Sequence, residues 1–531
     1  MFQRLSATST IVYFQLGKFI QMTGLIGLFL LSSSNCLGQN ETNLATDGKK
    51  VLLMADDNLL LYSSGLKQVL QMPARYEKNP VIPNDNPWEL AIGYCSVHRD
   101  PITGEYACWY QSYAGNRAQD PTRRVTLCYA TSKDGLTWTK PKLRLFDFNG
   151  DLDTNIVLVG NGGRSVNYGA SVLFDPTDTK PGKRYKLAYW DFTENEGLQK
   201  PGLCVAFSPD GIRWKKHSKA PLLQGSYGEP TQPPFSNESD HLPPGRPAIS
   251  DVMDLMWDPV NEQYCIYSKT WIDGPDGRRF WKRAVARTTS KDFINWSQPQ
   301  LILSPNSDED QQFHGASVFY DGGLYLGLLQ RLDLGGFDRG GSGNMPAELI
   351  WSIDGLHWDR PFRDLFFMPI NKDKNSFDAG CLWTSANPIR HGSSIRFYYG
   401  AYPGWHADLT ASPTGIGLMT IPLNRWIGLT PENRIGQTTL KPVYLEKETE
   451  ITINADASEG EIRVELLDAS GYRVQGFSSD VAEPLHDDGL AQKVRWKNDP
   501  LKPLSPGNYQ IRVHLKQSTL YALCLDRKKQ R

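Results

Sequence analysis

Three acidic residues stand directly before predicted strands and are placed to do acid–base chemistry. Glu89 lies in the run NPWEL, Asp251 in PAISDVMDLMWD and Asp378 in NSFDAGCLW. Crowded carboxyl groups have separated pKa values, so that one is protonated while another is ionised. Hydrolysis of a glycosidic bond uses such a pair. These residues are therefore candidate catalytic groups, with Asp251 as base or nucleophile, Glu89 as general acid and Asp378 as an orienting partner, the roles being interchangeable among the three.

A shared position in four predicted strands supports this choice. Each of these strands ends in a turn acid, at Asp100, Asp175, Asp258 and Asp321. The residues seven places before these acids are Gly93, Tyr168, Asp251 and His314. If each strand opens one sheet around a common axis, side chains at this position face the same central funnel. Asp254 follows Asp251 by three residues, which predicts the opposite face of a regular strand.

Further side chains near these points are candidates for substrate binding. They are Trp88, Tyr168, Arg246, His314, Trp383 and His406. The aromatic rings could stack on the apolar faces of sugars, and the arginine could hold a carboxylate or orient Asp251. The histidines could contact a ligand, although a hydrogen-bonded structural histidine is an ordinary alternative.

The elements that would position these residues are visible as an internal repeat. The motif Ser-x-Asp-(Gly/Phe)-x-x-Trp occurs at residues 132–138, 208–214, 290–296 and 352–358, each time after a strand-like run. Asp-Gly favours a tight turn, and the tryptophan is suited to fill the gap between neighbouring sheets. A fifth unit, LWTSANPIRHGSSIRFYYGAY, keeps the hairpin and lacks the tryptophan turn. The repeat predicts an all-β, five-bladed β-propeller over residues 39–435, whose radial closure protects the sheet edges. The segment 51–82 is expected to lie beside the first blade or to complete the ring.

The two ends of the chain differ from the repeat. From residue 436 to 531, runs such as ETEITINADA and NYQIRVHLK alternate apolar and polar residues, which predicts a C-terminal β-sandwich. At the N-terminus, Arg4 and Lys18 precede the apolar run 19–31 and the small residues SSSNCLGQ. This order is typical of a secretory signal cleaved after Gly38, and the run is short for a membrane span. We expect a secreted or periplasmic protein, with lipid anchoring at Cys36 as the weaker alternative.

Charge and motif content narrow the range of partners. The 57 Lys and Arg residues balance 58 Asp and Glu residues, which argues against a nucleic-acid-binding protein. No CxxC motif or Cys/His cluster suggests a metal site, and no organic cofactor is implied. The loop DFNGDLDTN offers alternating oxygen ligands to calcium, but Leu158 stands where a bidentate glutamate would complete an EF-hand. A solvated turn is the simpler interpretation of this loop.

Several stretches resemble the five-bladed propeller glycoside hydrolases of families 32, 43, 68, 117 and 130, and more closely a set of secreted glycosidases of planctomycetes. The matching stretches are KNPVIPNDNPWE, SVHRDPITGEYACWYQ, SKDGLTWTKP, SDVMDLMWDP, SFDAGCLW and ITINADASEGEIRVELLDASG. The resemblance implies a propeller with a central sugar site, an accessory sandwich and a carbohydrate substrate. The Glu-Cys pair of family 32 does not occur, so no catalytic role is carried over from that family.

Three functions are compatible with these observations. The first is a glycoside hydrolase acting on poly- or oligosaccharides through carboxyl groups in the funnel. The second is a non-catalytic carbohydrate-binding propeller, which needs only aromatic and amide contacts. The third is a sialidase-like enzyme, because the Ser-x-Asp-Gly turns are similar to sialidase Asp boxes, although they are one residue shorter.

Overall fold

A computed structural model describes residues 50–161, 167–195, 198–225, 246–277, 280–306, 311–333, 343–406, 408–497 and 504–526. The predicted signal at residues 1–38, with Cys36, lies outside this part. The described residues form antiparallel strands and four single 3-10 turns, η1 (Asp57–Leu59), η2 (Gly115–Arg117), η3 (Pro121–Arg123) and η4 (Pro181–Lys183). The all-β prediction is confirmed. Within the described residues, no helix is long and apolar enough to cross a membrane.

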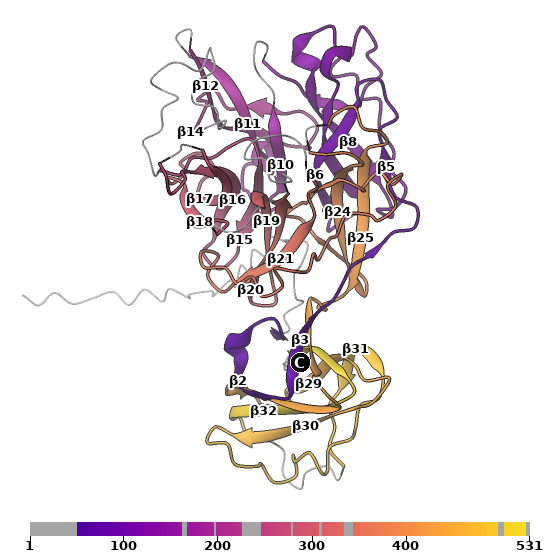
Figure 1. Ribbon diagram of the computed structural model, residues 1–531, viewed down its shortest axis with the longest axis vertical. Coiled ribbons are helices and arrows are strands. Elements are labelled where there is room, and N and C mark those ends of the chain that lie inside the picture. Colours follow the sequence, from indigo (N-terminus) through magenta and orange to yellow (C-terminus); the bar gives the residue numbers. More distant parts are fainter. Residues whose placement is uncertain are drawn as a thin grey trace, which may run out of the picture. The chain divides into compact units, whose positions relative to one another are not determined.

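Five of the sheets follow one another along the chain (Figure 1). The first contains β6 (Ala91–Arg99), β7 (Tyr106–Tyr113), β8 (Val125–Ser132) and β9 (Ile156–Leu158). The second contains β10 (Tyr168–Phe174), β11 (Tyr185–Asn195), β12 (Leu198–Ser208), β13 (Lys215–Lys216) and β14 (Leu223–Gln224). The third contains β15 (Met253–Asp258), β16 (Gln263–Ile272), β17 (Lys282–Ser290) and β18 (Gln300–Leu303), and the fourth β19 (Gln312–Asp321), β20 (Leu324–Leu332) and β21 (Ala347–Ser352).

The fifth sheet combines strands that precede the other four sheets in the sequence with strands that follow them. It contains β22 (Cys381–Trp383), β23 (Ile389–His391), β24 (Ser394–Tyr402) and β25 (Gly415–Pro422), together with the early strands β4 (Ala74–Arg75) and β5 (Ile82–Pro83). β4 and β5 both pair with β25. Part of the segment 51–82 therefore completes the last sheet of the ring, which was one of the two positions expected for this segment.

The first strands of these sheets surround a common centre. β6 contacts β10, β10 contacts β15, β15 contacts β19, and β22 contacts β6. Between the fourth and fifth sheets, the Ser317 hydroxyl on β19 lies 2.6 Å from the hydroxyl of Thr384, the residue that follows β22. This circular order of first strands is the arrangement of a β-propeller.

The repeated turn fastens each sheet to a neighbour. An aromatic side chain on a second strand donates a hydrogen bond to the carbonyl of the turn residue in the next sheet, and the last sheet bonds to the first in the same way. The three such bonds are Trp109 Nε1 to Gly211 (2.6 Å), Tyr267 OH to Gly355 (3.2 Å) and Tyr398 OH to Gly135 (2.8 Å). A Cβ atom at Gly135, whose φ is +72°, would lie 2.4 Å from the Tyr398 oxygen. The turn therefore needs glycine for its conformation and for this contact.

The motif's tryptophan and aspartate have the structural roles predicted for them. Trp138 packs edge-on against Tyr398 of the preceding sheet, with ring centroids 5.8 Å apart. The Asp134 carboxylate accepts hydrogen bonds from the backbone N–H groups of Leu136 and Thr137, both at 2.8 Å. The tryptophan thus fills the gap between sheets while the aspartate fixes the turn.

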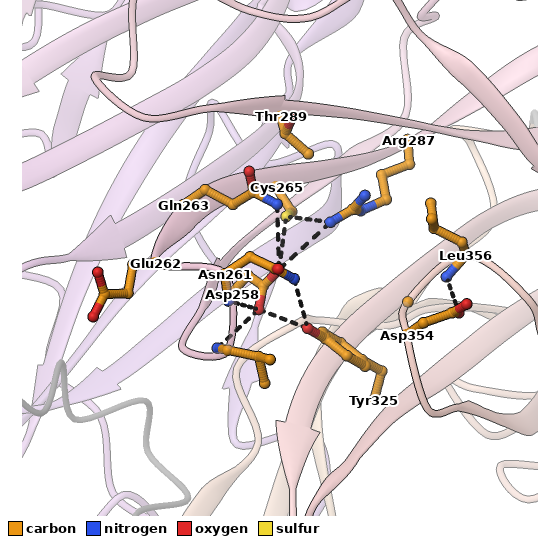
Figure 2. Close-up of polar contacts among 12 residues, drawn as sticks. Asp258, Asn261, Glu262, Gln263, Cys265, Arg287, Thr289, Tyr325, Asp354 and Leu356 are labelled. Atoms are coloured by element: carbon orange, nitrogen blue, oxygen red, sulfur yellow. Dashed lines mark hydrogen bonds and ion pairs between the residues drawn. The ribbon is translucent and has the colours of Figure 1, made fainter. Parts of the chain in front are cut away.

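The turn acids at the ends of the first strands also link sheets. Asp258, at the end of β15, accepts a 2.7 Å hydrogen bond from the Tyr325 hydroxyl on β20 (Figure 2). Asp175, at the end of β10, accepts the same bond from Tyr264 on β16. These two acids are therefore structural. Each ends its first strand at a position seven residues after a predicted funnel residue, Tyr168 or Asp251.

Two further sheets form the sandwich. One contains β1 (Lys50–Leu53), β3 (Leu66–Leu70), β26 (Ile427–Pro431), β29 (Glu450–Asp456), β31 (Asp488–Lys493) and β33 (Thr519–Asp526). The other contains β2 (Leu60–Ser64), β27 (Ile435–Leu440), β28 (Val443–Leu445), β30 (Glu461–Asp468) and β32 (Gly507–Lys516). A core of buried aliphatic side chains, including Ile453, Val464 and Val513, draws on both sheets. The sandwich thus uses strands from before residue 71 as well as from 427 onward.

Candidate functional site

The four positions predicted to share the funnel follow one another in space. Gly93 on β6 has no side chain, and a Cβ there would lie 3.2 Å from the Tyr113 ring. The Tyr113 ring packs against that of Tyr168, with centroids 5.9 Å apart. Beside Tyr168, the backbone of Gly169 lies so close to the Asp251 carbonyl that a Cβ would come within 2.7 Å of it.

The contact series continues to the fourth sheet. Gly315, next to His314, lies against Val252, next to Asp251, and a Cβ on Gly315 would be 2.8 Å from the Val252 side chain. The structure therefore brings Tyr168, Asp251 and His314 to one centre, as their common spacing from the turn acids indicated.

Asp251 is an ion-paired and mostly buried carboxylate. Its side chain is 19% exposed and contacts the ammonium of Lys269 on β16. The Ser250 hydroxyl donates a 2.9 Å hydrogen bond to the same carboxylate. Burial disfavours the charged form, but the Lys269 charge and these hydrogen bonds outweigh it and hold the pKa of Asp251 below its ordinary value. Asp251 is thus ionised at neutral pH.

Asp254, three residues further on, has a contrasting environment. Its buried carboxyl accepts hydrogen bonds from the Ser317 hydroxyl (2.7 Å) and from the backbone N–H of Ala386. Burial raises the pKa of Asp254 to about 7, because these neutral donors only partly offset the loss of water. Asp254 is therefore the group in this centre that can carry a proton near neutral pH.

Both carboxyl groups act on the same tyrosine. Burial raises the pKa of Tyr94 on β6 well above its ordinary value, and the charges of Asp251 and, more weakly, Asp254 raise it further. Asp254 was predicted to lie on the opposite face from Asp251. That rule holds inside a regular strand, but Asp251 precedes β15, which begins at Met253. The two aspartates in the run SDVMD, Asp251 and Asp254, were the feature of the sequence that could have indicated this pair.

Aromatic rings line the same centre. The Trp383 ring lies 4.0 Å from that of Tyr402 and 6.1 Å from that of Tyr94, measured between centroids. Trp383, Tyr402 and Tyr113 belong to one buried cluster, against which Tyr94 and Tyr168 pack. Of these residues, Trp383 and Tyr168 were predicted from the sequence. Tyr94, Tyr113 and Tyr402 were not, because tyrosine inside a strand is ordinary core composition.

The two predicted histidines meet. The rings of His314 and His406 lie edge to face, 5.2 Å apart, and His314 Nδ1 lies 3.1 Å from the Gln330 amide oxygen. Burial first, and then the neighbouring His406 and Lys269, lower the pKa of His314 well below its ordinary value. His314 is thus a neutral hydrogen-bonding group close to the Asp251–Lys269 pair.

Glu89 and Trp88 are placed inside the first sheet. The Glu89 carboxylate accepts hydrogen bonds from Tyr110 OH and from Lys140 Nζ, both at 2.7 Å, and from two backbone N–H groups. Trp88 is buried and donates through Nε1 to Asn155 Oδ1 at 3.1 Å. These are the contacts of groups that hold a strand connection in place.

Asp378 has a matching environment in the fifth sheet. It is fully buried and accepts hydrogen bonds from Arg75 Nε (2.8 Å), Tyr399 OH (2.9 Å) and Ser376 Oγ (2.6 Å). Burial opposes ionisation, but these donors and the Arg75 charge hold its pKa below the ordinary value. Arg75 lies on β4, so this ion pair fastens the early strand to the last sheet.

The predicted set of three carboxylates is not assembled by direct contacts. Among the described residues, no hydrogen bond or ion pair joins Glu89 or Asp378 to Asp251. Arg246 is exposed, five residues before Asp251. The polar groups that contact the Asp251 carboxylate are instead Lys269 and Ser250.

The loop considered for calcium uses its oxygens elsewhere. Asp153 pairs with Lys142 (2.9 Å) and Arg144 (2.8 Å), while the buried Asn155 donates to Tyr110. Within the described ranges, no three His, Cys, Asp or Glu side chains are grouped as metal ligands. These ion pairs are those of a surface turn.

Comparisons with other proteins give likeness at a low level. No family model matches the chain, and no curated protein matches it. Among solved structures, the chain is similar to one described as a glycoside hydrolase (13% identity, 67% of this chain and 92% of that chain, TM-score 0.45). It is also similar to a Bombyx mori β-fructofuranosidase of glycoside hydrolase family 32 (12%, 86% and 93%, 0.38). A third similar structure belongs to family 130, described as mannoside phosphorylases that include glycoside hydrolases targeting β-1,2-mannosidic linkages in Candida mannan (16%, 66% and 94%, 0.40). Likeness at this level carries no argument about activity, which rests on the contacts above.

Proposed function

We propose that the chain is a carbohydrate-active enzyme that hydrolyses glycosidic bonds, with Asp254 as the general acid and Asp251 as the base or nucleophile. The observation that carries this proposal is the pair of buried carboxyl groups at the start of β15, one ion-paired with Lys269 and one held only by neutral donors. Asp251 precedes β15 and Asp254 lies on it, and the charges of both raise the pKa of Tyr94 on β6.

The two environments supply the two states that the reaction needs. Cleavage requires a proton for the leaving oxygen and a negative charge that attacks the anomeric carbon or activates water. Asp254 retains a proton near pH 7, because burial disfavours its charge. Asp251 is kept ionised beside Lys269. The division of labour follows from the surroundings of each carboxyl group.

The lining of the centre supports a carbohydrate substrate. Tyr94 and Tyr168 are partly exposed aromatic residues of this centre, and the buried Trp383 packs against Tyr94. Sugar rings have apolar C–H faces and polar edges, so they suit a site that combines aromatic rings with carboxylates and imidazole. His314, in contact with His406, adds a neutral hydrogen-bonding group to this site.

The test compares carboxyl variants on a panel of aryl glycosides and polysaccharides. Asp251→Asn and Asp254→Asn should each lower kcat/KM by about 10²–10⁴-fold, the usual contribution of an acid–base group. Asp321→Asn is the control, because Asp321 is also a buried acid of a first strand but pairs with Arg390 and Trp426 at the end of β19. Wild-type rates in both site variants would refute the assignment.

The same panel decides the roles of Glu89 and Asp378. If they act only through their structural bonds, Glu89→Gln and Asp378→Asn should lower the stability and leave kcat of the folded fraction near that of the wild type. A loss of kcat in a fully folded Glu89→Gln protein would return Glu89 to the role of general acid. Oligosaccharide binding by the wild type without turnover of any substrate would favour the non-catalytic carbohydrate-binding alternative.

We also propose that the protein is exported and processed after Gly38. The support is the order of basic, apolar and small residues in positions 1–38. Sequencing the N-terminus of the protein recovered from a bacterial periplasm tests this, and an intact N-terminus would contradict it.

A further inference from the structure

The sandwich carries a cavity, distant in sequence from the carboxyl pair. It has a volume of about 410 Å³ and is lined by residues of β2, β27, β30 and β32, together with Gly65 after β2. This volume falls within the range of small-ligand sites, about 300–1,000 Å³. All four strands belong to one sheet of the sandwich, so the cavity is a groove on that sheet.

Strand register places polar side chains in rows across the groove. Ser64 is paired with Gln437, Gln437 with His514, and His514 with Arg463, which makes one row over four strands. A second row contains Ile435, Lys516 and Glu461. The alternating residues Val513 and Leu515 are buried in the sandwich core, so the rows lie on the solvent face of the sheet.

The charges of the groove do not balance. Glu461 is the only carboxylate that lines it among the described residues, and it lies 3.4 Å from Arg463 and 3.8 Å from Lys516. Arg463 donates from Nη2 to Glu461 at 3.4 Å and from Nη1 to the Ala482 carbonyl at 3.1 Å, and its side chain remains 32% exposed. Two fixed cations therefore share one carboxylate at the groove surface.

A buried carboxylate fixes the histidine of the groove. Glu465, two residues after Arg463 on β30, is fully buried and lies 3.3 Å from His514 Nε2 and 3.1 Å from Arg512 Nη1. The contact restrains the imidazole where it lines the groove. Tyr62 does not line the cavity, but it is 51% exposed and lies two residues before the lining residue Ser64, on the same face of β2. The groove thus has an aromatic ring at one border.

From this arrangement we infer that the sandwich groove binds an acidic oligosaccharide, whose carboxylate or sulfate group contacts Arg463 and Lys516. The partly exposed guanidinium keeps N–H groups beyond its bonds to Ala482 and Glu461, which suit such anions, and the ammonium adds a second charge. Gln437, His514 and Ser64 supply hydrogen-bonding groups for sugar hydroxyls, and Tyr62 supplies a stacking surface. The inference does not rest on the proposed hydrolase activity.

Calorimetric titration of the full chain tests the inference with three ligands: a trisaccharide of uronic acids, a sulfated disaccharide and a neutral trisaccharide. The wild type should bind at least one acidic ligand and should bind the neutral one at least tenfold more weakly. Arg463→Gln and Lys516→Gln should each weaken acidic-ligand binding about tenfold. The two acidic ligands show whether carboxylate or sulfate is preferred.

A matched control excludes a general effect of charge. Lys493→Gln removes a lysine that is similarly exposed and paired with Glu450, but on β31 of the other sheet, and it should leave affinity unchanged. Any acidic saccharide bound at the first-strand centre binds equally to all variants, so only groove binding responds to Arg463→Gln. The inference is overturned if neither acidic ligand binds, if the neutral ligand binds as tightly, or if both groove variants retain wild-type affinity. Loss of activity in Asp251→Asn with intact groove binding would leave it standing.

Discussion

Replacing Asp254 by asparagine is expected to stabilise the fold at pH 8 and to weaken it slightly at pH 4. In the wild type, the pKa of Asp254 is about 7 in the folded state and near 3.8 in the unfolded chain. The folded state therefore binds more protons between these values, and stability falls as pH rises through them. A difference of about three pH units, at 1.36 kcal/mol each, corresponds to about 4 kcal/mol above pH 7.

The variant lacks this pH-dependent loss, because an amide does not titrate. At pH 4 it should be less stable than the wild type by about 1 kcal/mol. The asparagine has one carboxamide oxygen where the acid has two oxygens, so its NH₂ group replaces an acceptor for the hydrogen bond from Ser317 or Ala386. At pH 8 it should be more stable by about 3 kcal/mol, because the wild type then carries a desolvated charge that the amide avoids. Other titrating groups contribute equally to both proteins and cancel in the difference.

Urea denaturation followed by tryptophan fluorescence at pH 4, 6 and 8 measures this difference. Asp258→Asn provides a control whose effect should change little over this pH range. Although burial opposes it, the donors Tyr325 and Asn261 hold the pKa of Asp258 below its ordinary value, so the wild type gains stability as pH rises (Figure 2). That gain is nearly complete just above the unfolded-chain pKa of 3.8, so this variant should be destabilised by nearly the same amount at pH 4, 6 and 8. A stability difference for Asp254→Asn that is the same at pH 4 and pH 8 would refute the reasoning.

Three further predictions concern the contacts that shape the site and the ring. Lys269→Met should raise the pKa of Asp251, move the acidic limb of the pH–rate profile to higher pH and cost about 3 kcal/mol of stability, because it leaves a buried carboxylate unpaired. Gly169→Ala should lower both stability and kcat, as a Cβ would meet the Asp251 carbonyl at 2.7 Å in a backbone with φ of +58°; unchanged melting and activity would show that this close approach is not needed. Tyr398→Phe should lower the unfolding free energy by about 1 kcal/mol through loss of its bond to Gly135, without affecting the pH–rate profile.

Local sequence was sufficient for the repeat and for the ring position. The turn at Ser132 and Asp134 is closed by hydrogen bonds between residues close in sequence, so the local sequence is enough to predict it. Tyr168, Asp251 and His314 could be found because each lies seven residues before the acid that ends its sheet's first strand, although these strands differ in length, from six residues in β15 to ten in β19.

The surroundings of each carboxyl group could not be predicted in the same way. Asp254 owes its neutral setting to Ser317, which is 63 residues away on another sheet. Glu89 and Asp378 precede their strands as Asp251 does, but tyrosines on the second strands, Tyr110 and Tyr399, bind them inside the sheets. Whether an acid before a strand faces the centre or the sheet interior thus depends on hydrogen-bond partners on other strands, which the local sequence does not predict.

The pairing of both chain ends has a consequence for how the protein is made. Lys50 of β1 pairs with Leu525 of β33, and Thr420 of β25 pairs with Ala74 of β4. A ribosome must therefore complete almost the whole chain before the earliest strands meet their partners. Loop closure over such separations is slow, and waiting strand edges invite association between nascent chains. A transcript cut short before β33 would yield polypeptides in which β1 lacks its paired strand, making them substrates for proteolysis rather than smaller working enzymes.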